Sequence, residues 1–106
     1  MAEEFRRVAI VGLGLKGGSL AMVLRKKRIA KEVVGIDTNK TILTKAVHRD
    51  IVDQAVAELA EGLPQADLIV IAVPTHTTPE VLASVAPHLK LGAIVCDVGR
   101  VKGPAL

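Results

Sequence analysis

The sequence predicts an α/β fold in which a doubly wound, mainly parallel sheet is flanked by helices. Short runs of β-branched and aliphatic residues alternate with stretches at helical spacing along the whole chain. These apolar runs are continuous rather than alternating, which is typical of strands covered on both faces. The length of 106 residues is enough for one domain with a real core. We therefore expect a single domain over residues 1–106.

Four apolar runs predict the main strands, at residues 8–11, 33–36, 68–73 and 93–96. A shorter pair, residues 51–52, predicts one further short strand. Glycine, aspartate or proline follows several of these runs, and such residues commonly end strands.

Helices are predicted between the strands, at residues 17–29, 40–48, 56–61 and 79–85. Asn39 is suited to cap the second helix and Gly62 to end the third. Pro79 fits the first turn of the fourth, because its missing N–H is not needed there.

The composition excludes several classes of protein. Aromatic residues are 1% of the chain, with Phe5 alone, so the core is aliphatic and no ring platform for nucleic-acid bases is expected. The net charge of +3 is concentrated in residues 25–28, which we interpret as a solvated helix end, with a nucleic-acid patch as the alternative.

No apolar run reaches the ~18–20 residues that would span a bilayer, and the N-terminus lacks a secretory signal, so a cytoplasmic protein is expected. Cys96, the single cysteine, excludes an internal disulfide and is expected to be buried and inert in its strand. The histidines and this cysteine have no ligand spacing, so no metal site is expected.

The turn after the first strand carries the strongest motif. Residues 12–17, GLGLKG, match G-x-G-x-x-G, follow a strand and open a helix, which is the dinucleotide-binding (Rossmann) fingerprint. Gly12 permits the tight turn, Gly14 lets a diphosphate approach the backbone, and Gly17 lets the helix pack on the strand. The N–H groups of Leu15 and Lys16 would then face the diphosphate. The alternative is a glycine-rich turn without a ligand.

Asp37 lies twenty residues after Gly17, at the end of the second predicted strand. A carboxylate there can accept hydrogen bonds from the adenine ribose hydroxyls and would repel the 2′-phosphate of NADP. The residues that follow, Thr38 and Asn39, are not the arginine that accommodates that phosphate, so NAD is the expected cofactor. A simple turn or capping role for Asp37 is the alternative.

The segments VAIVGLGLKGGSLA, VVGIDTN, IVDQAV, ADLIVIAVP and APHLKLGAIVCDVGRVKG together resemble the N-terminal domain of prephenate/arogenate dehydrogenases. The resemblance covers about residues 8–103. It implies an NAD-dependent oxidoreductase of tyrosine biosynthesis, which oxidises a ring hydroxyl of prephenate or arogenate by hydride transfer with loss of CO₂. It also implies that the loop of Val73, Pro74, Thr75 and His76 lines the nicotinamide side.

The chain departs from the family pattern at two positions. Lys16 stands where an apolar residue is usual, and it would reach either the diphosphate or solvent. Arg100 replaces the serine of the family's DVGSVK segment, and it would be either a partner of a substrate carboxylate or an exposed loop residue.

The resemblance also implies that the family's catalytic histidine and helical second domain lie beyond Leu106, so we expect a truncated domain with no catalytic residue of its own. Such a chain should bind NAD and turn over little substrate, and it could self-associate through the face that a second domain would cover. Two other functions stay open: an NAD(H)-sensing module without catalysis, and another hydroxyacid or imine dehydrogenase of related fold.

Overall fold

The structure, a computed structural model, describes residues 5–73 and 78–98. Its strands are β1 (Phe5–Val11), β2 (Ala30–Ile36), β3 (Gln54–Val56), β4 (Leu68–Ile71) and β5 (Ile94–Asp97). Its helices are α1 (Leu15–Lys26), α2 (Lys40–His48), α3 (Leu59–Gly62) and α4 (Thr78–Val85), followed by a short 3-10 helix, η2 (Ala86–His88). Helices and strands alternate along the chain, as the apolar runs predict.

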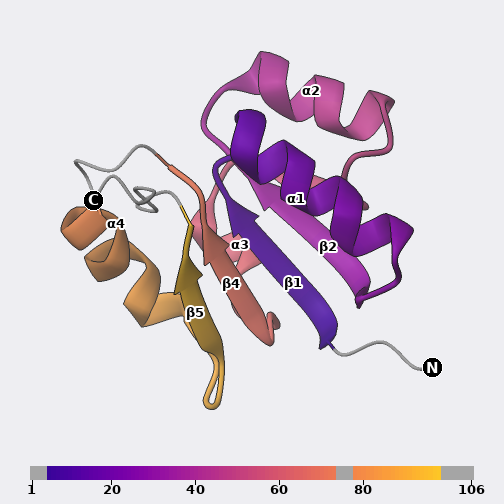
Figure 1. Cartoon of the computed structure of the whole chain (residues 1–106). Coiled ribbons are helices and arrows are strands. Elements are labelled where there is room, and N and C mark those ends of the chain that lie inside the picture. The colour runs from indigo at the N-terminus through magenta and orange to yellow at the C-terminus, as the bar shows by residue number, and fades with distance from the viewer. Residues whose placement is uncertain (1–4, 74–77, 99–106) are drawn as a thin grey trace, which may run out of the picture.

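All four strand pairings are parallel, and the sheet order is β3-β2-β1-β4-β5 (Figure 1). The chain therefore runs from β1 outward to β3, returns across the sheet, and adds β4 and β5 on the other side of β1. This doubly wound arrangement confirms the predicted fold class.

The two faces of the sheet carry separate cores, and alternate residues of each strand supply them. Val8 and Ile10 of β1 pack under α1 and α2, whereas Ala9 and Val11 face the side of α3 and α4. All four are buried. Burial on both faces explains why the strands read as continuous apolar runs rather than as alternating ones.

The region between α2 and β4 differs from the prediction. The short strand lies at Gln54–Val56 instead of 51–52, and the helix is shortened to Leu59–Gly62. Val52 is apolar because it fills the core from a loop, at 2% exposure, rather than because it belongs to a strand. Gly62 packs closely on β2, because a Cβ there would lie 2.6 Å from Cδ1 of Ile36 and that side chain would have to shift.

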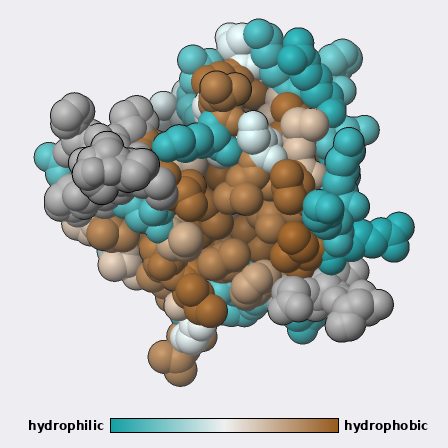
Figure 2. Space-filling model, viewed as in Figure 1, coloured by the Kyte–Doolittle hydropathy of each residue, from teal (hydrophilic) through white to brown (hydrophobic). Residues whose placement is uncertain are grey.

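Cys96 corrects another expectation, because it is exposed rather than buried. Its partner across the strand pair, Val70, packs toward α1, but α1 and α2 cover β1, β2 and β3 and stop short of β5. The same side of β5 exposes 55% of Ile94. We call the surface formed by Leu68, Ile94 and Cys96 the β5 face; it belongs to the apolar area beside α1 in Figure 2.

The basic run of residues 25–28 lies at the end of α1, as expected for cations that complement the helix dipole. Arg25 forms an ion pair with Asp53 at 3.1 Å. Within the described ranges, 5–73 and 78–98, no helix has the length and apolar character needed to cross a membrane.

Candidate functional site

The loop that follows β1 is built around glycines that the fold itself requires. Gly12 has a φ of +99°, and its N–H donates to the carbonyl oxygen of Ile36 at 2.7 Å. A Cβ at Gly17 would lie only 1.9 Å from the carbonyl oxygen of Gly12. Glycine at position 17 therefore allows the first turn of α1 to rest directly on the loop.

Gly14 is different, because the fold does not require a glycine there. It is the N-cap of α1, with φ −70° and ψ −157°, and a Cβ at this position would meet no atom within 4 Å. No side chain caps the helix, and no acidic residue lies in its first turn. The N-terminus of α1 thus presents its N–H groups and positive dipole end beside open space.

Asp37 ties this loop to the end of β2. One carboxylate oxygen, Oδ2, accepts the N–H of Leu13 at 2.9 Å, and the other, Oδ1, accepts the N–H of Asn39 at 2.9 Å. Asn39 in turn caps α2 through the N–H groups of Thr41 and Ile42, as predicted. The half-buried carboxylate therefore holds the glycine loop and the start of the β2–α2 connection together.

Two hollows adjoin at this edge of the sheet and share Gly12, Asp37, Thr38 and Val73. The first has a volume of about 510 Å³ and runs along the glycine loop; it is lined by Gly12, Gly14, Leu15, Lys16, Asp37, Thr38, Ile42, Ala72 and Val73. The second, of about 390 Å³, lies toward α3 and α4; it is lined by Val11, Gly12, Ile36, Asp37, Thr38, Ala57, Leu59, Val73, Glu80, Val81 and Ser84. We call the two together the carboxyl-edge groove, because it lies where β1, β2 and β4 end.

Most of the predicted site residues meet in this groove: Gly12, Gly14, Leu15, Lys16, Asp37 and Val73 all line it. Gly17 lies beneath the loop. Pro74, Thr75 and His76 fall outside the described residues, as does Arg100. Lys16 is exposed and forms no ion pair within the described part of the chain.

The sequence reasoning missed the apolar half of the groove. Ala57, Leu59 and Val81 line it, although none belongs to a recognisable motif. The available signal was positional, because ligands of open α/β sheets bind at the carboxyl ends of the strands, where the following helices begin. Thr38, next to Asp37, could have been found in the same way. Among the described residues, no cluster of histidine, cysteine or acidic side chains is arranged to hold a metal ion.

Comparison with known proteins identifies a family to which the chain is similar. The family model described as the nucleotide-binding domain of prephenate dehydrogenase matches residues 20–105. The prephenate dehydrogenase of Lactococcus lactis is 37% identical over 98 residues, which are 92% of this chain and 27% of that protein.

Two solved structures have the same fold with comparable identity. Synechocystis arogenate dehydrogenase superimposes with a TM-score of 0.82 at 37% identity, covering 92% of this chain and 34% of the other. Prephenate dehydrogenase from A. aeolicus, in complex with hydroxyphenyl propionate and NAD⁺, gives a TM-score of 0.82 at 30% identity, covering 93% and 35%.

The chain thus spans about a third or less of the length of the relatives it matches. Within that span the family model covers most of the residues, including β2 to β5. By this match, the chain belongs to the prephenate dehydrogenase family and corresponds to its nucleotide-binding domain.

Proposed function

We propose that this chain binds NAD in the carboxyl-edge groove, as the cofactor-binding part of an oxidoreductase that acts on prephenate or arogenate. The observation that carries the proposal is Gly14, a glycine with open space where its Cβ would be, beside a helix N-terminus that no side chain caps. A diphosphate bound at this position would explain both why a glycine stands where the fold does not require one and why no side chain caps the N–H groups at the start of the helix.

The groove offers a suitable surface for each part of the dinucleotide. The N–H groups at the start of α1 would bind the diphosphate, and Asp37 would accept the adenine ribose hydroxyls through the lone pairs that Leu13 and Asn39 leave free. The apolar hollow beside Leu59 and Val81 would take the adenine. Val73, with Pro74 and Thr75 after it, would lead to the nicotinamide side.

The charge of Asp37 favours NAD over NADP, since a 2′-phosphate would meet a carboxylate. Lys16 lines the same hollow and forms no ion pair within residues 5–73 and 78–98, so its ammonium is available to the diphosphate.

Bound NAD would accept a hydride from the substrate ring, and this chain would supply binding and orientation. A general base must lie within hydrogen-bond reach of the proton that it removes. No described side chain of the groove is assigned that role, so we propose that the 106 residues alone have little or no turnover. In the whole enzyme the reaction would serve tyrosine biosynthesis in the cytoplasm, with prephenate or arogenate as the carboxylate substrate.

Replacing Gly14 with alanine tests the proposal. We expect the dissociation constant for NAD to rise about tenfold or more, because the methyl group occupies the space that the diphosphate needs and keeps it from the N–H groups. The melting temperature should stay unchanged, since the new Cβ meets no atom within 4 Å. Isothermal titration calorimetry and thermal unfolding measure the two quantities separately.

The matched control is Gly18→Ala, four residues along and outside the groove, where a Cβ would have only an ordinary contact at 3.7 Å from the carbonyl oxygen of Leu13. It should leave NAD affinity unchanged. A folded Gly14→Ala protein that binds NAD as well as the parent does would contradict the proposal.

We also infer that the 106-residue chain by itself self-associates, with the β5 face of one copy against that of a second copy. The support is the uncovered apolar surface at Ile94, which is 55% exposed and lies on the edge strand β5. A two-fold pair would bury this surface on both copies.

We expect Ile94→Lys to shift the chain toward monomer in light scattering and to increase the reactivity of the Cys96 thiol, which lies on the same face. The control is Leu82→Lys, which changes a side chain 40% exposed on α4 and should leave association unchanged. A parent chain that is monomeric at all concentrations would contradict the inference.

A further inference from the structure

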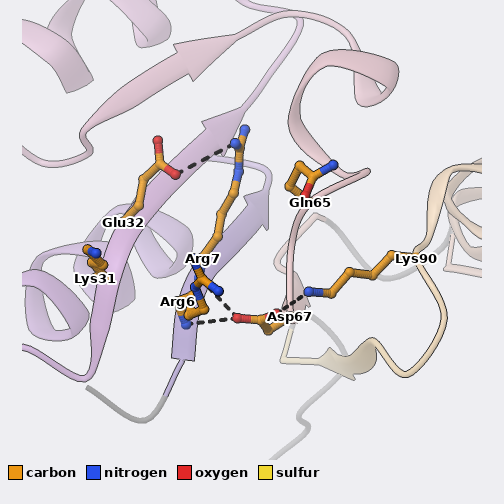
Figure 3. Close-up of a pocket in the computed structure, with 7 residues that line it drawn as sticks. All are labelled: Arg6, Arg7, Lys31, Glu32, Gln65, Asp67 and Lys90. Atoms are coloured by element: carbon orange, nitrogen blue, oxygen red, sulfur yellow. Dashed lines mark hydrogen bonds and ion pairs between the residues drawn. The ribbon is translucent and has the colours of Figure 1, made fainter. Parts of the chain in front are cut away.

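Another hollow lies at the opposite edge of the sheet from the glycine loop. Its volume is about 460 Å³, and it opens at the amino ends of β1, β2 and β4 (Figure 3). We call it the amino-edge hollow, and it is lined by Arg6, Arg7, Lys31, Glu32, Gln65, Asp67 and Lys90. None of these residues lines the carboxyl-edge groove.

The amino-edge hollow carries a surplus of positive charge. Four of its side chains are cations, and its two carboxylates, Glu32 and Asp67, balance only two of them. Gln65 adds an amide N–H₂ that can donate hydrogen bonds. The wall therefore consists mostly of donors.

The Asp67 carboxylate is already hydrogen-bonded within the protein. It accepts hydrogen bonds from Nζ of Lys90, from the backbone N–H of Arg6 at 2.8 Å and from the backbone N–H of Arg7 at 3.2 Å. The bond from Lys90, followed by those two backbone N–H groups, lowers the pKa of Asp67 to about 2. Its ion pair is with Lys90, and it forms none with the other cations of the hollow.

The Arg7 side chain has a buried N–H group without a hydrogen-bond partner. Figure 3 shows its side chain reaching toward Glu32, and the closest atoms of that pair, Nη1 and Oε1, are 3.6 Å apart. Only 19% of the Arg7 side chain is exposed, and its Nε is shielded from solvent without a hydrogen-bond partner. With one ion pair at 3.6 Å, the guanidinium has donor capacity left over, and its positive charge adds to the attraction of the hollow for an anion.

The remaining cations, Arg6 and Lys31, are exposed and form no ion pair with any described residue. They come from adjacent strands, since Arg6 is the second residue of β1 and Lys31 is the second residue of β2. In the strand register they lie opposite each other on one face of the sheet, whereas Arg7 points to the other face, so the hollow has two unpaired positive charges side by side at the sheet edge.

We propose that the amino-edge hollow is a binding site for a small polyanion bearing phosphate or carboxylate groups, held by Arg6 and Lys31, with Arg7 adding positive charge from the other face of the same strand. Arginine is suited to this role because its planar donors match phosphate and carboxylate oxygens in pairs. The site is separate from the carboxyl-edge groove, so the proposal stands whether or not NAD binds there.

The test is a titration of the ¹⁵N-labelled chain with inorganic phosphate and, separately, with citrate. Sodium chloride at matched ionic strength serves as the reference. We expect saturable shifts of the backbone amides of Arg6 and Arg7 with at least one of the two anions and none with chloride. Binding of phosphate alone identifies the ligand as a phosphate compound, and binding of citrate alone identifies it as a polycarboxylate. Shifts confined to Leu15 and Lys16 would place phosphate at the glycine loop instead and would overturn the proposal.

A charge-matched pair of variants tests the residues. The double variant Arg6→Gln with Lys31→Gln should weaken anion binding about tenfold or more, because it removes two charge-assisted contacts. Both side chains are exposed and unpaired within the described residues, so the fold should be kept. The control double variant, Lys27→Gln with Lys45→Gln, removes the same charge elsewhere and should bind as the parent does. Equal weakening in both double variants, or no saturable binding by the parent, would overturn the proposal.

Discussion

Replacing Gly17 with alanine is expected to be the most damaging single-methyl change in the glycine loop. The added Cβ would lie 1.9 Å from the carbonyl oxygen of Gly12 and 3.3 Å from the Cβ of Ala72. The first of these atoms belongs to the backbone, so the clash is relieved only if α1 moves away from the loop. We expect a loss of about 3 kcal/mol or more in the free energy of unfolding, at the upper end of overpacking effects. Urea unfolding followed by circular dichroism measures it.

The control is the neighbouring residue. Gly18→Ala adds the same methyl group to the same helix, with its closest contact at 3.7 Å. It should be neutral or stabilising by about 0.5–1 kcal/mol, because alanine is the better helix former. Equal stability of the two variants would show that the close approach of α1 to Gly12 is not a constraint on the fold.

Replacing Asp37 with serine should weaken NAD binding about tenfold or more and narrow the difference between NAD and NADP. The side chain has two tasks: it would accept the ribose hydroxyls, and it already holds the N–H of Leu13 at 2.9 Å. Serine removes the charged acceptor for the ribose and the hydrogen bond that holds the loop. Charge-assisted hydrogen bonds such as these are stronger than those between neutral groups. NADP loses the tether too but is freed from a like charge, so its affinity should fall less. Fluorescence titration with NADH and NADPH gives both dissociation constants.

Asp37→Asn separates the two tasks. Its amide oxygen can still accept the N–H of Leu13 while the negative charge is gone, so we expect NADP to gain relative to NAD without the loss of the loop tether. Glu61→Gln removes the same charge from an exposed site in α3 and should change neither constant. Unchanged affinities for both cofactors in Asp37→Ser would refute the assignment of this residue.

The fold class could be predicted from the sequence because a parallel sheet covered on both faces produces a strong hydrophobic pattern. The continuous apolar runs of β1, β2 and β4 arise from burial on both faces, and the cap at Asn39 is a local interaction within four residues. The prediction of a strand at residues 51–52, before β4, was wrong because the pattern there does not come from local structure. Val52 is apolar because of a distant core contact, which a local pattern does not distinguish from a strand. The prediction that Cys96 is buried was wrong because β5 has the sequence pattern of a central strand but lies at the edge of the sheet.

Some parts of the site could likewise be predicted from the sequence, and others could not. The glycine loop and Asp37 could be predicted because a short, regular spacing carries their geometry, and the structure brings them to one groove. The wall formed by Leu59, Val81 and Ser84 comes from two helices that meet only in three dimensions. The amino-edge hollow has no motif at all, since its charges come from three strand beginnings and a loop that are far apart in the chain. The tether from Leu13 to Asp37 was also missed, because it joins a backbone N–H whose direction the sequence does not reveal.

The wall behind the glycine loop bears on the order in which the chain acquires its structure. The loop is encoded at residues 12–17, but the atoms against which Gly12 packs belong to Ala72 and Val73, about sixty residues later. A nascent chain that has emerged from the ribosome only as far as β2 therefore contains the glycine motif but not the residues against which Gly12 packs. Long-range pairing of this kind slows folding, because a large loop must close before the contact forms. The finished shape of the loop thus depends on the residues that directly follow β4 as well as on β2, and the glycine-rich segment should become fully rigid only after β4 has been synthesised.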